Sequence, residues 1–220
     1  MPESQWLMSA IAGTGEPGYS GDGGPATQAL LNNPFDLAFD PQDNLCFSDT
    51  YNHCIRRIDA RTGVITTIAG TGEAGFAGDG GPAIQARMNQ PYGIVIDGAG
   101  NIYIADRLNK RVRRIDAGNS AISTMAELVE PNGLALDPAQ RRLFIADVAD
   151  HRVRVIDLAS GALSTFAGTG NGRHAGDGGT AAEADIFGAR AVAFAPDGSV
   201  YILERQGSSL RAVDPAPMTS

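Results

Sequence analysis

Several features that would point to common functional classes are scarce or absent in this chain of 220 residues. There is no run of about 18 apolar residues, so the sequence predicts no membrane-spanning helix. Positive charge is also scarce: 17 Lys and Arg face 25 Asp and Glu, a formal net charge of −8. Because nucleic-acid binding needs a clustered basic surface, this balance argues against a nucleic-acid partner.

The start of the chain, MPESQWLMSA, has neither a basic beginning nor a long apolar stretch. As given, it is therefore not expected to be a signal peptide, and the compartment stays open. The chain is either cytoplasmic or, if a leader has been trimmed, secreted. Cysteine is limited to Cys46 and Cys54, on strands expected to pair out of register. Two free, partly buried thiols are favoured over a disulfide, and they do not fix the compartment.

Motifs for several enzyme classes are also missing. No G-x-S-x-G or His-led triad pattern is present, so serine hydrolase chemistry has no support. The Gly-Asp-Gly-Gly sequences have neither a following Lys nor a strand–loop–helix context, which makes a phosphate cradle a poor interpretation. The three histidines, His53, His151 and His174, are expected in loops. His53 and His151 fall in equivalent turns and are interpreted as surface residues rather than as a metal pair.

Glycine is abundant, with 28 residues, and much of it lies in a long internal repeat. The segment 68–115 is closely similar to 11–58 and to 166–213, and a shortened copy covers 125–156. The Asp that ends each unit recurs at spacings of 57, 41 and 57 residues; these are Asp59, Asp116, Asp157 and Asp214. Self-similarity at such a period predicts a repeat architecture.

Each unit is expected to form four strands. In the second unit these are 92–97, 101–106, 111–116 and 121–126, separated by turns rich in Gly and Asn. The second strand is apolar on both faces, which indicates a sheet packed between two neighbouring sheets. Such sheets in series are typical of a β-propeller, an all-β fold.

We therefore expect a single propeller domain over 1–220 with four four-stranded blades at roughly 13–69, 70–126, 127–167 and 168–214. The N-terminal strand Trp6–Ala12 is expected to close the last blade. Four blades is the lower limit for such a ring, so a part of a larger propeller is kept as an alternative.

The segments PYGIVIDGAGNIYIADRLNKRVRRI (Pro91–Ile115) and DTYNHCIRRI (Asp49–Ile58) resemble NHL repeats, and the resemblance extends over nearly the whole chain. It implies an NHL-type β-propeller. It does not imply one activity, because the family includes binding and scaffold domains, extracellular modules and a few enzymes.

Two resemblances to enzymes are more local. DVADHRV (Asp147–Val153) and the D-x-Y of Asp49–Tyr51 are similar to peptidylglycine amidating lyases, which would make Tyr51 a candidate catalytic phenol. The zinc-binding histidines of those enzymes have no match at the innermost strands here. PNGLALDP (Pro131–Pro138) is similar to calcium-dependent gluconolactonases, which would make Asn132 a metal ligand, with Asp36 as a second oxygen donor.

Residues shared by all blades are interpreted as structural, because four blades cannot all hold the same site. An acidic residue ends each second strand and an arginine lies within each third strand, which predicts a ring of ion pairs that fix the blades. The acidic positions are Asp49, Asp106, Asp147 and Glu204, and the basic ones are Arg56, Arg113, Arg154 and Arg211.

Glycine-rich insertions precede three of the four units and are expected to form a rim on one face. Asp22 and Asp79 are expected to cap a short helix in these insertions, and Tyr19 and Phe76 to fold the loop onto its blade. His174 takes the equivalent aromatic position in the last unit. In the third unit the insertion shrinks to 127–130.

A functional site is expected where the blades differ. The residue that opens each innermost strand faces the channel mouth, and the four residues there are Phe35, Tyr92, Asn132 and Arg190. With Asp36, they suit a small polar or anionic ligand held by Arg190. The alternative is that Phe35 and Tyr92 plug the channel while Asp36 pairs with Arg190.

The sequence thus favours a binding or interaction module that uses its loop-rich face and channel mouth, with a protein or a small polar or anionic ligand as partner and a homodimer as one possible assembly. No cofactor is expected. The alternative is a metal-assisted lactonase- or lyase-type enzyme centred on Asn132, Asp36 and Arg190, in which calcium or zinc would enter and Tyr51 or Arg190 would be the catalytic candidates.

Overall fold

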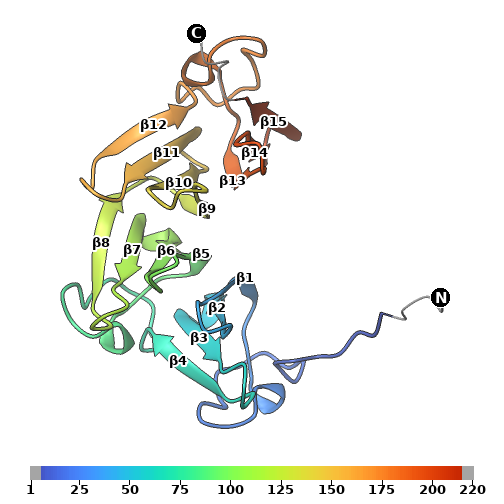
Figure 1. Ribbon diagram of the computed structural model, residues 1–220, viewed down its shortest axis with the longest axis vertical. Helices are drawn as coiled ribbons and strands as arrows, with labels where there is room; N and C mark the ends of the chain where they lie inside the picture. Colours follow the sequence, from blue (N-terminus) through green and yellow to red (C-terminus); the bar gives the residue numbers. More distant parts are fainter. Residues whose placement is uncertain (1–5, 215–220) are drawn as a thin grey trace.

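The structure is a computed structural model and describes residues 6–214. It is all-β, with fifteen strands in four antiparallel sheets. The sheets stand side by side along an open arc, with their innermost strands turned toward its centre (Figure 1). This is the arrangement of propeller blades.

The first two sheets contain four strands each, in sequence order. The first is formed by β1 (Pro34–Phe39), β2 (Leu45–Asp49), β3 (Cys54–Ile58) and β4 (Ile65–Ala69). The second is formed by β5 (Pro91–Ile96), β6 (Ile102–Asp106), β7 (Arg111–Ile115) and β8 (Ile122–Glu127). The predicted strands of the second unit therefore agree with the structure to within one residue at each end.

The third sheet also has four strands, and the last has three. The third is formed by β9 (Pro131–Leu136), β10 (Arg142–Asp147), β11 (Arg152–Asp157) and β12 (Leu163–Ala167). The fourth is formed by β13 (Ala189–Phe194), β14 (Val200–Glu204) and β15 (Ser209–Val213).

The expected closure of the last blade by the N-terminal strand is not found. Residues Trp6–Ala12 form no strand, and the side chains of Trp6 and Met8 are almost fully exposed. The reason is geometric. Ala12 packs with the apolar cluster of the first sheet, and the next residue donates its N–H to Ala26 there. The first and last sheets lie at opposite ends of the arc, so this segment runs away from β15 (Figure 1).

The core lies between neighbouring sheets. Tyr103 and Phe144 occupy the same position on consecutive sheets, and they are only 3% and 1% exposed because each is covered by the sheet that follows. Tyr201 takes that position on the last sheet and is 40% exposed. The expectation that the second strand is covered on both faces thus holds for the inner sheets but not for the last one.

The glycine-rich insertions lie over the outer parts of the first, second and fourth sheets. Each contains one 3₁₀ turn: η1 (Ala26–Gln28), η3 (Ala83–Gln85) and η5 (Ala181–Glu183). The prediction that Asp22 and Asp79 cap these turns is wrong, since no side chain caps them. The two carboxylates instead bind the arginines of their blades, as described below.

The remaining 3₁₀ turns, η2 (Thr50–Asn52) and η4 (Arg107–Asn109), join the second and third strands of the first two blades. Among residues 6–214 no helix is long and apolar enough to cross a membrane. Cys46 and Cys54 are free and buried, in agreement with the sequence. They pair with Arg57 and Asp49 in the β2–β3 ladder, which places them out of register with each other.

Candidate functional site at the channel mouth

The four residues that open the innermost strands lie at one end of the arc's central channel. Phe35, Tyr92, Asn132 and Arg190 are each the second residue of their strand. Consecutive innermost strands pack against one another, which brings these positions toward a common axis. Farther along these strands an open hollow of about 440 Å³ lies between β1, β5 and β9, and its lining includes the polar side chains of Asp36, Asp137 and Gln140.

Two aromatic rings and two guanidinium groups form a continuous stack across this mouth, which we call the mouth stack. The rings of Phe35 and Tyr92 lie parallel, with centroids 4.1 Å apart. The guanidinium of Arg107 lies 4.7 Å from the Tyr92 centroid, and that of Arg190 lies 5.7 Å from the Phe35 centroid. The stack therefore joins the second blade, through the first, to the fourth.

The two arginines of the stack differ in their partners. Arg107 donates from Nε to the Glu130 carboxylate at 3.0 Å and from Nη1 to Gln90 at 3.1 Å. Its charge is thus neutralised inside the protein. The guanidinium of Arg190 makes no hydrogen bond or ion pair with residues 6–214. The five N–H donors of this guanidinium therefore have no partner among the described residues.

Asp36 is engaged by the backbone rather than by Arg190. One carboxylate oxygen accepts the N–H of Ile94 at 3.1 Å, and the other accepts the N–H of Leu37 at 2.9 Å. The expectation that Asp36 pairs with Arg190 is therefore wrong. Asp36 instead ties the first innermost strand to the second.

The residue at the Asp36 position of the next blade shows how close these strands are. It is Gly93, and a Cβ atom there would lie 2.3 Å from the carbonyl oxygen of Asn132. Only glycine fits against that backbone. At the equivalent position of the first blade, the Asp36 side chain reaches the Ile94 N–H of the second.

Asn132 is 3% exposed, and its side-chain amide donates to the carbonyl oxygen of Glu130 at 3.2 Å. Asp36 and Asn132 do not fit a calcium site by themselves, because Ca²⁺ takes six to eight oxygen ligands and the Asp36 oxygens already serve two backbone N–H groups. Within the described part of the chain, no three His, Cys, Asp or Glu side chains are grouped to hold a metal ion.

Tyr51 lies in the η2 turn and its side chain is 47% exposed. Its backbone N–H donates to Asn32, but its hydroxyl has no hydrogen-bond partner in residues 6–214. The structure therefore does not hold this candidate phenol in the mouth stack.

Two of the histidines brace the neighbouring blade. The Nδ1 of His53 accepts the N–H of Gln90 at 3.1 Å, and the Nδ1 of His151 accepts that of Gly188 at 3.2 Å. Burial lowers the pKa of His53, which favours the neutral imidazole that this acceptor role requires. Both are thus half-buried connectors between blades, more than the plain surface residues that the sequence indicated.

The predicted ion pairs form in three blades of four. Arg56 lies 3.2 Å from Asp49, Arg113 lies 3.6 Å from Asp106, and Arg211 lies 3.2 Å from Glu204. Each insertion adds a second carboxylate to its arginine, at distances of 2.9, 2.7 and 2.7 Å for Asp22, Asp79 and Asp177.

Arg154 of the third blade is the exception. It pairs with Asp150 at 3.1 Å, while Asp147 accepts the backbone N–H groups of Val129 and Glu130. The shortened insertion brings no carboxylate to this blade, so its arginine turns to the nearest one available. The ring of ion pairs is therefore structural, as expected, but incomplete.

Tyr19 and Phe76 fold over these arginines as expected, with ring centroids 5.1 Å from Arg56 and 5.3 Å from Arg113. His174, in the same position of the last blade, lies 3.1 Å from Glu204 and within reach of Asp177.

Arg107 and Glu130 are the residues of the mouth that the sequence reasoning missed. Arg107 follows the acidic residue of its blade, and the equivalent positions are Thr50, Val148 and Arg205. That variation between blades is the signal that could have revealed it.

Curated proteins and solved structures both include chains similar to this one, whereas no family model matches it. Among curated proteins, it is 30% identical over 110 residues to Protein SUPPRESSOR OF QUENCHING 1, chloroplastic, of Arabidopsis thaliana, covering 50% of this chain and 10% of that protein. It is also 30% identical over 117 residues to NHL repeat-containing protein 2 of Bos taurus, covering 52% of this chain and 16% of that protein. About half of the chain is thus similar to NHL repeat-containing proteins.

Solved structures support the propeller fold of the chain. A gluconolactonase from Xanthomonas campestris matches with a TM-score of 0.58 and 20% identity, over 86% of this chain and 65% of that one. A chain from a nidogen/laminin complex matches with a TM-score of 0.55 and 16% identity, over 83% and 65%. Hydrazine synthase of Kuenenia stuttgartiensis matches at 0.61 and 19%, over 90% and 49%. At these identities the likeness concerns the fold alone.

The chain thus spans a small part of the curated relatives and between about half and two thirds of these three structures. Whatever the larger proteins do as wholes comes to this chain only as a proposal.

Proposed function

We propose that the chain is an NHL-repeat binding module whose channel mouth takes a ligand carrying a carboxylate. The observation behind this proposal is the Arg190 guanidinium, which is partly exposed, stacks against Phe35 and has no acidic partner among the described residues. A carboxylate can accept two parallel hydrogen bonds from one guanidinium, and an aromatic ring beside it excludes water from the pair.

The residues around Arg190 suit a ligand that carries a carboxylate. The edges of the stacked Phe35 and Tyr92 rings offer an apolar border beside Arg190, and an open hollow of about 440 Å³ lies farther along the innermost strands. This volume lies within the range usual for small-molecule sites. The nearby acid Glu130 is already paired with Arg107, so it does not compete for Arg190.

The enzyme alternative, a lactonase- or lyase-type reaction centred on Asn132, Asp36 and Arg190, has weaker support. The fold is shared with a gluconolactonase and a virginiamycin B lyase, but at 20% and 15% identity. Asp36 is held by two backbone N–H groups and Asn132 is buried, so neither is presented as a free base or ligand.

The test is a binding panel of small carboxylic acids, each beside its methyl ester, measured by ligand-observed NMR and calorimetry. We expect at least one acid to bind and its ester to bind at least about tenfold more weakly, with Arg190→Gln reducing acid affinity by a similar factor. Arg61→Gln, on an exposed turn at the far end of the first sheet, is the matched control and should leave the affinity unchanged. If Arg190→Gln binds as tightly as the parent protein, the proposal is wrong.

A further inference from the structure

The outer strands of the first two blades are held from outside by the insertions. Gly23 donates its N–H to the carbonyl of Ile65 at 2.8 Å, and Ile65 donates back to Gly24 at 3.0 Å. The second blade repeats both bonds between residues 80–81 and Ile122, at 2.7 and 3.0 Å. The insertion therefore forms one wall of a groove, and the third strand of the sheet forms the other.

The side chains at the start of these outer strands fill the groove completely. Ile65 and Ile122 are 0% exposed, and the alanines that face them in the insertions, Ala26 and Ala83, are 2% and 1% exposed. In two blades of this chain, then, a strand that begins with a branched apolar residue completes the sheet.

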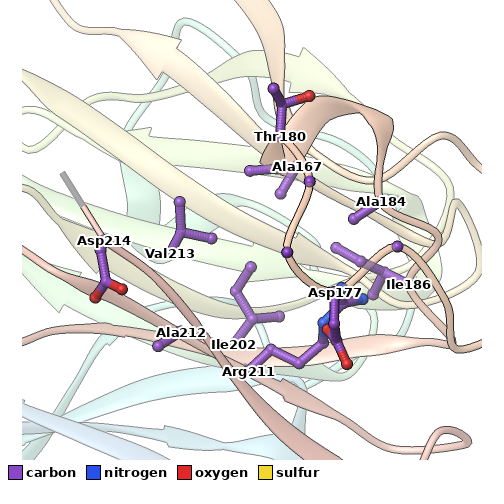
Figure 2. A pocket seen from close by; sticks show the side chains of 14 residues that line it. Ala167, Asp177, Thr180, Ala184, Ile186, Ile202, Arg211, Ala212, Val213 and Asp214 are labelled. Atoms are coloured by element: carbon purple, nitrogen blue, oxygen red, sulfur yellow. Dashed lines mark ion pairs between the residues drawn. The ribbon is translucent and has the colours of Figure 1, made fainter. Parts of the chain in front are cut away.

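The fourth blade has the same groove, and no strand formed by residues 6–214 lies in it. A cavity of about 500 Å³ lies beside β15, between that strand and the insertion (Figure 2). Its lining includes Ala181, Ala184, Ile186, Ile202 and Val213, which are the counterparts of the residues around Ile65 and Ile122. We call this cavity the outer-strand groove.

Backbone N–H groups along the insertion side of the outer-strand groove also lack partners among the described residues. The backbone N–H groups of Gly178 and Ala181 have no acceptor among residues 6–214, whereas their counterparts Gly23 and Ala26 both bond to the outer-strand side of the first blade. Ala181 is also half-exposed, in contrast to Ala26. The groove thus offers the hydrogen bonds and the apolar pocket that a fourth strand would use.

The chain contains a segment with the sequence of such a strand. Ala12 and the glycine after it match the Ala-Gly pairs that end β4 and β12, and this alignment places Met8 at the position of Ile65. Residues Trp6–Ala12 carry no charge, form no strand and expose Trp6, Leu7 and Met8 by more than nine-tenths. Within residues 6–214, therefore, an uncharged apolar segment forms no strand while the outer-strand groove holds none.

We propose that two copies of the chain exchange these segments, so that Trp6–Ala12 of one copy adds to β15 of the other as its fourth strand, with Met8 in the outer-strand groove. Exchange within one copy is disfavoured, because Ala12 is anchored on the first sheet at the opposite end of the arc (Figure 1). The β3–β4 pairing, in which Arg57 lies opposite Thr66, predicts that Ser9 of one copy lies opposite Ala212 of the other.

The test uses that register. The double variant Ser9→Cys/Ala212→Cys places two thiols opposite each other across the exchanged strand, while the native Cys46 and Cys54 are buried at 1% and 0% exposure. Under mild oxidation we expect a covalent dimer on a non-reducing gel, with the two introduced thiols linked between copies by peptide mapping of isotope-mixed protein. The matched control pairs Ser9→Cys with Ala99→Cys on an exposed turn, and should show at least about tenfold less of this product because its two thiols are not held opposite each other.

The other outcomes contradict the proposal. A disulfide between the two introduced thiols within one chain would show that the strand closes its own blade, and the absence of any such disulfide in a folded protein would show that the groove does not take this segment. Native mass spectrometry of the unmodified protein provides a second measurement. Met8→Asp should shift a dimer to monomer, whereas Ser9→Asp, whose counterparts Ser123 and Ser164 are exposed, should not.

Discussion

The second and third blades share a strand pattern but differ in what covers their arginines. In the second blade an insertion brings Asp79 to Arg113, and the arginine side chain is 0% exposed. In the third blade the insertion is shortened to 127–130, and Arg154 is 23% exposed and paired with Asp150. The comparison indicates that the insertions make a buried arginine possible, because a buried guanidinium needs more than one acceptor.

The largest loss of stability is expected when the buried guanidinium of the second blade is removed. Arg113→Ala leaves Asp106 and Asp79 without their partner, and Asp106 is fully buried. We expect a loss of about 3–5 kcal/mol in the free energy of unfolding, which is typical when one partner of a buried pair is removed. Urea denaturation followed by far-UV circular dichroism measures it.

Arg154→Ala is the matched control for that experiment, since its pair is partly exposed. It should cost no more than about 1 kcal/mol, as exposed ion pairs do. Equal losses in the two variants would show that the insertion does not distinguish the blades.

The stability of the second blade should also depend on pH, through Asp106, the buried partner of Arg113. Burial raises the pKa of Asp106 to about 6, above its ordinary value of 3.8. In the folded state this carboxyl then binds a proton more tightly than in the unfolded state, so its contribution to stability is present below about pH 4 and is lost as the pH rises to about 6. At about 1.4 kcal/mol for each pKa unit, the change is up to about 3 kcal/mol.

Asp106→Asn removes that titration. The difference in unfolding free energy between the parent and this variant, measured by urea denaturation from about pH 4 to about pH 7, should therefore shift in favour of the variant as the pH rises. A difference that stays constant over this range would show that Arg113 holds Asp106 ionised throughout.

The smallest expected effect concerns the aromatic cover of the insertion. Phe76 lies over Arg111 at 3.8 Å and over Arg113 at 5.3 Å. Phe76→Leu keeps an apolar side chain but removes both cation–π contacts, and should cost about 0.5–1 kcal/mol at this half-exposed site. Tyr19→Phe in the first blade keeps the ring and loses only the hydrogen bond to Thr67, so a smaller change is expected in its thermal midpoint.

The sequence predicted the blades well because each blade is specified locally. Alternating apolar residues and the Gly and Asn turns recur in every unit, and the acidic and basic columns follow from the same repetition. Ring closure could not be predicted in this way. The strand count fits four blades, but closure depends on the angle between neighbouring sheets. That angle is set by the side-chain volume across each contact, and a repeat pattern does not determine it.

The candidate site was predicted only in part for a similar reason. The positions of Phe35, Tyr92 and Arg190 follow from the repeat, and they do meet at the mouth. The partner of Asp36 does not follow from it, because the Ile94 N–H belongs to another blade and comes within reach only through the packing of the two sheets.

Trp6 is the only tryptophan of the chain, and it lies 96% exposed on the N-terminal segment, away from every sheet. In a single copy, intrinsic tryptophan emission therefore reports on that segment and is almost blind to the blades, so a melting curve followed by it would show little change while the sheets unfold. In an exchanged dimer the same emission would change when the segment leaves its partner blade. Conversely, a shift of the emission wavelength at constant temperature would show that another group now covers this N-terminal segment.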